Sequence, residues 1–153
     1  SFVVCGGAGV LDRSIGVGSF VVPNAAVRDE GLSYKYLAPC REIQANPRAV
    51  AAITATLEAH NEPYRIAKTW TTDALFRETV TRVARRKAEG CATVEMEAAG
   101  LMAVAQFRAV ELGYMLYGGD DVSGTEWDQR NDTPRLPIAE RMLYLSLEAC
   151  LKL

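Results

Sequence analysis

Residues 91–100, Cys91-Ala-Thr-Val-Glu-Met-Glu-Ala-Ala-Gly100, join a short apolar run to a helical one and so indicate the class of fold. Cys91–Val94 has the composition of a buried strand, and from there to Leu112 the apolar residues recur at helical spacing. Gly113 ends the predicted helix, and Tyr114–Tyr117 is typical of a second buried strand. A strand, a helix and a strand in this order predict two parallel strands joined by a right-handed crossover.

Strands and helices alternate on both sides of this segment. Asn46-Pro47 predicts the N-cap and first turn of a helix that extends to about His60. Tyr64–Trp70 alternates as a strand does, Arg77–Glu89 is a charged helical stretch, and Pro137–Leu151 is a last amphipathic helix. The alternation predicts an α/β fold, a three-layer α/β/α sandwich with a mixed, largely parallel central sheet, formed by residues 1–153 as a single domain.

The first part of the chain contributes two further strands. Phe2–Cys5 predicts a buried strand that leads into a glycine-rich turn, Gly6–Gly9. Val17–Val22 predicts the next strand, closed by Pro23, and residues 24–44 predict a loop with short pieces of structure. Because the chain opens inside an apolar run, we expect a domain that is incomplete at its N-terminus.

Composition excludes several classes of function. The 153 residues include 17 basic and 19 acidic side chains, a net charge of −2, which offers no basic field for a nucleic-acid polymer. No apolar run reaches the roughly 18 residues that a membrane span needs. The four cysteines are far apart and His60 is the only histidine, so neither a metal centre nor a disulfide framework is predicted. We expect a cytoplasmic protein without cofactor or metal.

Four predicted strand ends carry glycine or polar residues, and ligands of α/β sheets bind beyond such ends. These ends are Gly6–Gly9, Thr71–Asp73, Glu95–Glu97 and Gly118–Asp121. The first is either a tight turn or a cradle of backbone N–H groups for an anion.

Glu95-Met96-Glu97 stands at a strand-to-helix junction. Both carboxylates would favour the positive end of the helix, which is one interpretation of the pattern. In the other, a carboxylate points into a pocket and accepts two hydrogen bonds from a vicinal diol such as a ribose, with the methionine as an adaptable apolar surface.

Asp120 follows a strand and two glycines. It is either part of a solvated turn or a partly desolvated acid that donates a proton to a leaving group. Trp127 is expected to pack its own loop, and His60 to lie at a solvent-exposed helix end.

Several of these motifs, in this order, resemble those of the nucleoside phosphorylase superfamily, which includes purine nucleoside phosphorylases, uridine phosphorylases and nucleosidases. The segment 91–100 is similar to its E-M-E-A-A-G signature, and residues 6–11 and 17–23 to its glycine turn and next strand. Residues 27–34 and 71–79 resemble the uridine-phosphorylase-like branch. The resemblance covers the C-terminal part of the family's sequences, about their last two-thirds.

The resemblance implies a role for particular side chains. Glu97 would bind the ribose hydroxyls, Met96 would pack against the sugar, and Glu95 would support the same pocket. Asp120 matches a position where purine-specific members assist protonation of the base. The segment that would line the base pocket contains Thr72, Asp73, Leu75 and Phe76.

For phosphate, the resemblance implies the backbone of Gly6 and Gly7. The family commonly places an arginine and a threonine or serine where this sequence has Val4 and Gly7, so the expected cationic clamp is missing. The implied partners are a nucleoside, phosphate as co-substrate, and further copies of the chain in a homo-oligomer, a dimer or a hexamer.

Three functions follow from the resemblance. The first is phosphorolysis of the N-glycosidic bond by a pentosyltransferase, which yields a base and ribose 1-phosphate. The second is a nucleosidase that uses water, which the missing arginine favours. The third is a nucleoside-binding fragment without catalysis, because part of the usual site is lacking.

Overall fold

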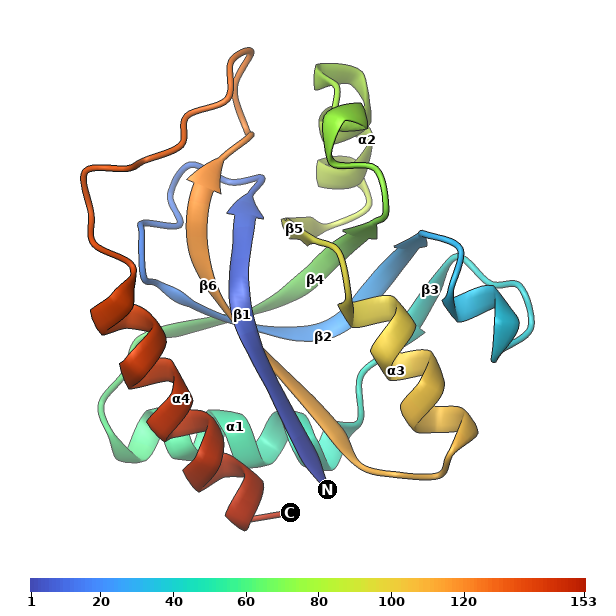
Figure 1. Ribbon diagram of the computed structural model, residues 1–153, viewed down its shortest axis with the longest axis vertical. Helices are drawn as coiled ribbons and strands as arrows, with labels where there is room; N and C mark the ends of the chain where they lie inside the picture. The colour runs from blue at the N-terminus through green and yellow to red at the C-terminus, as the bar shows by residue number, and fades with distance from the viewer.

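The computed structural model describes residues 1–153, in six strands and four helices (Figure 1). The strands are β1 (Phe2–Val10), β2 (Phe20–Asp29), β3 (Glu42–Gln44), β4 (Tyr64–Thr72), β5 (Cys91–Glu95) and β6 (Leu112–Asp121). The helices are α1 (Pro47–Ala59), α2 (Val80–Ala88), α3 (Ala98–Phe107) and α4 (Leu136–Leu151), and short 3₁₀ turns lie at Ser33–Lys35 and Leu75–Arg77.

One mixed sheet organises the chain and confirms the predicted α/β class. Its order is β3-β2-β4-β5-β1-β6, and β6 also pairs with β2, so the sheet curls back on itself. The pairs β1–β6, β2–β4 and β4–β5 are parallel, whereas β1–β5, β2–β3 and β2–β6 are antiparallel. The curl gathers the ends of β1, β5 and β6 at one place.

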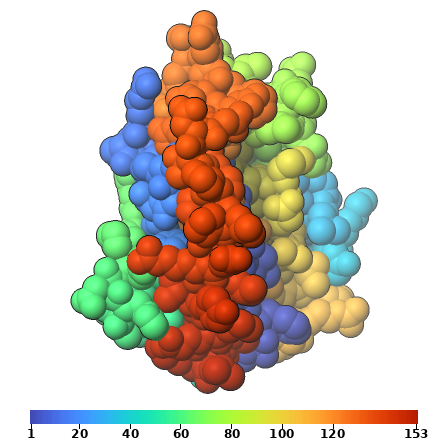
Figure 2. Space-filling model, turned by 60° about the vertical axis from the view of Figure 1, so that its left-hand side comes forward, coloured from blue at the N-terminus to red at the C-terminus, as the bar shows by residue number.

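Helices cover the sheet on two sides. In Figure 1, α1 and α4 lie together below the sheet and α3 lies beside β3. The helices α1 and α4 bury apolar side chains against β2 and β6, namely Ile53, Leu57, Met142 and Leu145 against Phe20 and Met115. None of the four helices is both long and apolar enough to cross a bilayer. Figure 2 brings α4 to the front of the molecule, where its outer face is uncovered.

The helix predicted from residue 47 is confirmed, and its start follows from local chemistry. Asn46 is the N-cap, and its Oδ1 accepts hydrogen bonds from the backbone N–H groups of Arg48 and Ala49 at 2.9 and 3.2 Å. Pro47 occupies the first turn, where no N–H is needed.

The expected glycine turn is wrong. Residues 6–9 continue β1 up to Val10, and Gly7 pairs with Tyr117 of β6. A Cβ atom on Gly7 would stand 3.0 Å from the Tyr117 ring. The glycine is therefore required by the close approach of that ring rather than by a bend of the backbone.

Two other boundaries differ from the prediction. Pro23 does not close a strand but lies inside β2, next to a register shift between Pro23 and Ala25, where a bulge tolerates proline. The helix α3 ends at Phe107, five residues before β6 begins at Leu112, whereas Gly113 lies inside β6.

The predicted parallel crossover from β5 to β6 is also wrong. Strand β1 lies between them, parallel to β6 and antiparallel to β5, so β6 runs opposite to β5. The β1–β5 contact consists of only two residue pairs, Gly9 with Val94 and Val10 with Thr93. The crossover rule describes neighbours in a regular parallel sheet and does not extend to this curled closure.

Candidate active site

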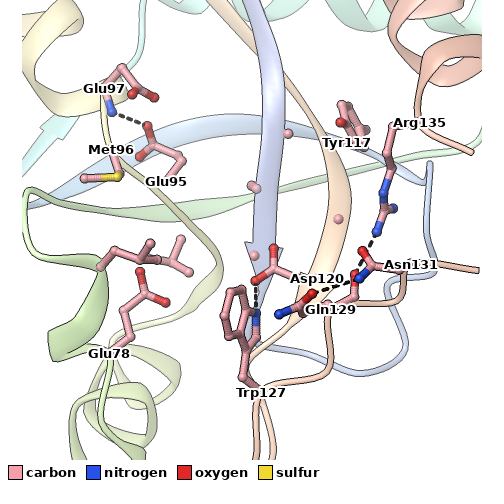
Figure 3. Close-up of a pocket in the computed structure, with 16 residues that line it drawn as sticks. Glu78, Glu95, Met96, Glu97, Tyr117, Asp120, Trp127, Gln129, Asn131 and Arg135 are labelled. Atoms are coloured by element: carbon pink, nitrogen blue, oxygen red, sulfur yellow. Dashed lines mark hydrogen bonds between the residues drawn. The ribbon is translucent and has the colours of Figure 1, made fainter. Parts of the chain in front are cut away.

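A cavity of about 480 Å³ lies where β1, β5 and β6 end (Figure 3). Its walls come from five separate parts of the chain. The lining residues are Gly7, Ala8 and Gly9 of β1; Leu75 and Glu78; Val94, Glu95, Met96 and Glu97; Tyr117, Gly119 and Asp120 of β6; and Trp127, Gln129, Asn131 and Arg135. The prediction of a site at strand ends agrees with this position.

Glu95 is buried at the junction between β5 and α3, and both of its carboxylate oxygens accept hydrogen bonds within the protein. One oxygen accepts hydrogen bonds from the N–H groups of Glu97 and Ala98 at 2.8 and 2.6 Å. The other accepts the hydroxyl of Thr71 at 2.6 Å and that of Thr69 at 3.3 Å. Burial raises the pKa of Glu95, and these hydrogen bonds oppose the rise. Glu95 therefore fixes the turn that presents the next two residues.

Glu97 is exposed toward the cavity, and its carboxylate makes no hydrogen bond or ion pair within the protein. Met96, which is 43% exposed, lies beside it. A carboxylate with all its acceptor sites free can accept hydrogen bonds from two neighbouring hydroxyls of a ligand. The junction thus combines a fixed carboxylate, Glu95, with a free one.

Asp120 enters the cavity from the end of β6. Its Oδ2 accepts a hydrogen bond from Nε1 of Trp127 at 2.5 Å. Trp127 itself lines the cavity, so its indole is a wall of the site as well as part of the loop. This donor fixes one oxygen of the aspartate and leaves the other available for a ligand.

Glu78 is a further acid in the same cavity, and it was not predicted as a site residue although it lies within the segment 71–79 that resembles the family. Its carboxyl group has no hydrogen-bond or ion-pair partner, and the residue lines both this cavity and a smaller neighbouring one of about 160 Å³. Burial, followed by the negative charge of Asp120, raises the pKa of Glu78 to about 7. The cavity therefore favours the protonated form of this carboxyl group more than water does.

The structure does not bring every predicted site residue together. Thr72 is buried, and its hydroxyl accepts the N–H of Ala74. Asp73 accepts the N–H of Gly31 at 3.1 Å and lines not the main cavity but an adjoining one of about 290 Å³, which Met96 and Glu97 also line. Phe76 is 92% exposed and lines only the smaller cavity. Leu75 and Gly7 do line the main cavity, whereas Gly6 does not.

Sequence reasoning missed the side chains from the loop between β6 and α4. Gln129, Asn131 and Arg135 all line the cavity. The loop has no periodicity, and the only available signals were its polar composition and the tryptophan at its centre. Its path back across the end of β6 is set by tertiary contacts, such as the antiparallel bridge between Asp121 and Asp128.

Comparison with known proteins decides the family. A family model of the phosphorylase superfamily matches residues 1–152. The chain belongs to this superfamily. The search of curated proteins finds no match to this phosphorylase-superfamily chain.

Solved structures share the fold of this phosphorylase-superfamily chain. The purine nucleoside phosphorylase of Toxoplasma gondii, in complex with immucillin-H, aligns with a TM-score of 0.82 at 19% identity, covering 98% of this chain and 63% of that one. The P. knowlesi homologue of P. falciparum PNP aligns at 0.79 and 23% identity, covering 97% and 60%. The AMP nucleosidase of Bacteroides thetaiotaomicron VPI-5482 aligns at 0.78 and 21% identity, covering 97% and 58%.

The chain thus spans about three-fifths of the length of each of these relatives. At such identities the likeness concerns the fold. None of the three is a uridine phosphorylase, so the branch expected from residues 27–34 and 71–79 stays a prediction.

Proposed function

We propose that this chain carries the sugar and base contacts of an enzyme that cleaves the N-glycosidic bond of a nucleoside by phosphorolysis. The observation that supports it best is the meeting of Glu97 and Asp120 in one cavity. The first is a carboxylate without any partner in the protein, and the second is an acid held by an indole N–H. Cleavage of this bond needs both a group that holds the ribose and a proton donor for the base.

In this proposal Glu97 accepts hydrogen bonds from the two ribose hydroxyls. As the bond to the base lengthens, positive charge develops on the sugar, and a carboxylate nearby stabilises it more in the transition state than in the ground state. Met96 packs against the sugar, and Glu95 keeps the turn in place. Leu75 and the indole of Trp127 offer apolar surface for the base.

Asp120 is proposed to protonate a nitrogen of the departing base. The bond between the anomeric carbon and the base breaks with its electron pair on the base, and a phosphate oxygen forms the new bond to that carbon. The proton that Asp120 gives is regained from the hydrogen phosphate, so the aspartate ends the cycle as it began. Such general acids typically contribute about 10²–10⁴ in rate.

Hydrolysis is the second candidate, and the charge of the cavity favours it. Four carboxyl groups, those of Glu78, Glu95, Glu97 and Asp120, face a single guanidinium, that of Arg135. Carboxylates repel a phosphate dianion but are suited to activating water.

The test is an assay of uridine and inosine with and without phosphate, with sugar products identified by mass. Phosphorolysis predicts ribose 1-phosphate and no turnover without phosphate, whereas hydrolysis predicts free ribose in both conditions. Binding of nucleoside without turnover would leave only the non-catalytic function, and neither binding nor turnover would reject the assignment of the site.

We further propose that the chain works as a homo-oligomer. Strand β1 pairs with β5 only at Gly9 and Val10, so the edge of residues 2–8 on that side is unpaired. The outer face of α4 exposes a stripe of apolar side chains, Leu143, Tyr144, Leu147 and Leu151. Unpaired edges and apolar patches are normally covered. Light scattering that gives the 16.7 kDa monomer mass at micromolar concentration would contradict this proposal.

A further inference from the structure

The smaller cavity of about 160 Å³ adjoins the main one at a shared wall. The residues that line both cavities are Leu75, Glu78 and Trp127. Those that line only the smaller cavity are Phe76, Thr79 and Val122. Figure 3 shows Glu78 and Trp127 at the end of the main cavity that lies away from Glu97. The smaller cavity therefore adjoins the main one at that far end.

In the proposed function, the base of the nucleoside occupies this end of the main cavity. Glu97 holds the ribose, and Asp120 meets the base from the end of β6. A base joined to that ribose extends away from Glu97, toward Leu75 and Trp127. A substituent on the far edge of the base would then enter the smaller cavity, which the function leaves without an occupant.

The smaller cavity is lined mostly by apolar side chains that the fold leaves exposed. Phe76 is 92% exposed and Trp127 is 55% exposed, whereas Val122 packs against a buried cluster of the core. Exposed apolar side chains that gather at one place mark a binding surface, while single ones do not. Because an apolar cavity of about 150 Å³ holds a benzene ring, this one has room for a group of that size.

Glu78 lies at the boundary between the two cavities, and its carboxyl group has no partner in the protein. Burial, followed by the charge of Asp120, raises its pKa and so favours the protonated form. A protonated carboxyl group offers one donor and one acceptor, which match the ring nitrogen and the exocyclic N–H of an amino base. Because a carbonyl oxygen of a base carries no further group, only an amino base can pair with Glu78 and also extend a substituent past it.

We propose that the smaller cavity binds an apolar substituent carried on the exocyclic nitrogen of the base, and that Glu78 accepts the N–H of that nitrogen. The ligand class is a nucleoside of an N-alkylated or N-benzylated amino base. This inference rests on the proposed function and deepens it, because it names the substrate class of the same site.

The experiment is calorimetric titration with two matched pairs of nucleosides. One pair is adenosine and its derivative with a benzyl group on the exocyclic nitrogen, and the other is cytidine and its corresponding benzyl derivative. The comparison is made within the pair whose parent nucleoside binds. A third member of each set carries a methyl group beside the benzyl group, so that it keeps the apolar ring but lacks the N–H. Cleavage of every nucleoside is followed with and without phosphate.

The wild type is expected to bind the benzyl derivative about 3- to 10-fold more tightly than its parent, because part of the apolar area of the ring leaves water. Val122→Phe fills the smaller cavity and is expected to abolish this preference while the parent binds as before. Phe76→Ala removes one apolar wall and is expected to reduce it. Phe107→Ala, which changes an exposed phenylalanine that lines neither cavity, is the control and should leave the preference unchanged.

Two variants of Glu78 test the hydrogen bond. Glu78→Gln keeps one acceptor and one donor and is expected to retain the affinity for the benzyl derivative. Glu78→Met has a similar size without the carboxyl group and is expected to weaken that affinity about 3- to 10-fold. The added methyl group should cause a similar loss in the wild type and none in Glu78→Met. Thermal melting of each variant checks that the fold is retained.

Three results would overturn the inference. Equal affinity of the wild type for the parent and for its benzyl derivative is the first, and a preference that survives Val122→Phe is the second. The third is a lower assembly mass of Phe76→Ala in light scattering together with an unchanged preference, because a second copy of the chain would then cover the cavity. If Val122→Phe does not fold, Phe76→Ala decides whether the preference depends on the smaller cavity.

Turnover separates this inference from the proposed function. A preference for the benzyl derivative that Val122→Phe abolishes, in a protein that cleaves no nucleoside, contradicts the function alone. Cleavage of nucleosides without any such preference contradicts the inference alone, and so does cleavage of inosine or uridine by a protein that binds neither matched pair. A protein that binds no nucleoside would reject both.

Discussion

Glu95 and Glu97 are two residues apart, but the structure gives them opposite tasks. Glu95 accepts four hydrogen bonds, two from backbone N–H groups of the turn and two from threonine hydroxyls of β4, whereas Glu97 offers a free carboxylate to the cavity. Glu95→Ala should therefore lower the stability of the protein. Glu97→Ala should leave stability unchanged and abolish binding of the ribose.

The expected loss of stability follows from the groups that Glu95→Ala leaves without a hydrogen-bond partner. These are the N–H groups of Glu97 and Ala98 and the hydroxyl of Thr71, and each unsatisfied buried group costs about 1–3 kcal/mol. Removal of a carboxyl group whose charged form is disfavoured by burial offsets part of this sum. We expect a net loss of about 3–5 kcal/mol, set against a typical total stability of about 5–15 kcal/mol.

Urea denaturation followed by circular dichroism measures the free energy of unfolding of both variants. For a chain of this length, the expected loss lowers the melting temperature by roughly 6–20 °C. Glu97→Ala should stay within about 0.5 kcal/mol of the wild type, as surface changes usually do. A loss below about 1 kcal/mol in Glu95→Ala, or an equal loss in both variants, would refute the division of tasks.

Asp120→Asn should lower kcat by about 10²–10⁴ with little change in melting temperature, and a smaller loss in a steady-state assay would remove it as the proton donor. In the same variant the pKa of Glu78, raised to about 7 partly by that charge, should fall, which ¹³C NMR titration of the carboxyl group would detect. The raised pKa of Glu78 favours its protonated form in the folded state. The wild type should therefore lose stability relative to Glu78→Gln as pH rises from 4.5 to above 7. Equal stability differences between the two proteins in denaturation at pH 5 and at pH 8.5 would contradict this prediction. Gly118→Ala would put a Cβ atom 2.7 Å from the Gly16 carbonyl oxygen and should cost about 1–3 kcal/mol, whereas Gly124→Ala, 3.7 Å from its nearest neighbour, should be tolerated in the same melt.

Features decided by neighbouring residues were predictable from the sequence. The cap at Asn46 and the stop before Tyr64 depend on groups a few residues apart, and both helix α1 and strand β4 lie where the pattern places them. Glu97 and Asp120 were singled out because each lies within three residues of the end of an apolar run, and their roles were implied by the resemblance to the family.

The prediction was wrong at glycines that the structure requires for tertiary packing rather than for a local turn. Gly113 was expected to end a helix, but a Cβ atom there would come within 2.8 Å of Ile53, so the glycine lets α1 approach β6. The chain after α3 instead turns at Ala109, which takes a φ of 52°. No local pattern distinguishes a glycine kept for a passing helix from one kept for a turn.

The loop residues of the site could not be found for a related reason. Trp127 and Arg135 reach the cavity because the chain after β6 folds back over the strand end, and the contacts that direct it join positions such as Ile15 and Arg130. These partners are 115 residues apart along the chain.

The two sides of the cavity differ in how firmly the rest of the fold holds them. The acidic turn at Glu95 is anchored on buried strands, whereas residues 123–134 between β6 and α4 are mostly exposed and joined by few contacts with the rest of the fold. Segments of that kind open at low free-energy cost. The sugar of a nucleoside would therefore meet a preformed surface at the Glu95 turn, whereas a group that contacts Trp127 and the rest of the loop would order its own binding site. The first contact is expected to form with a small entropy change and the second with a larger, unfavourable one.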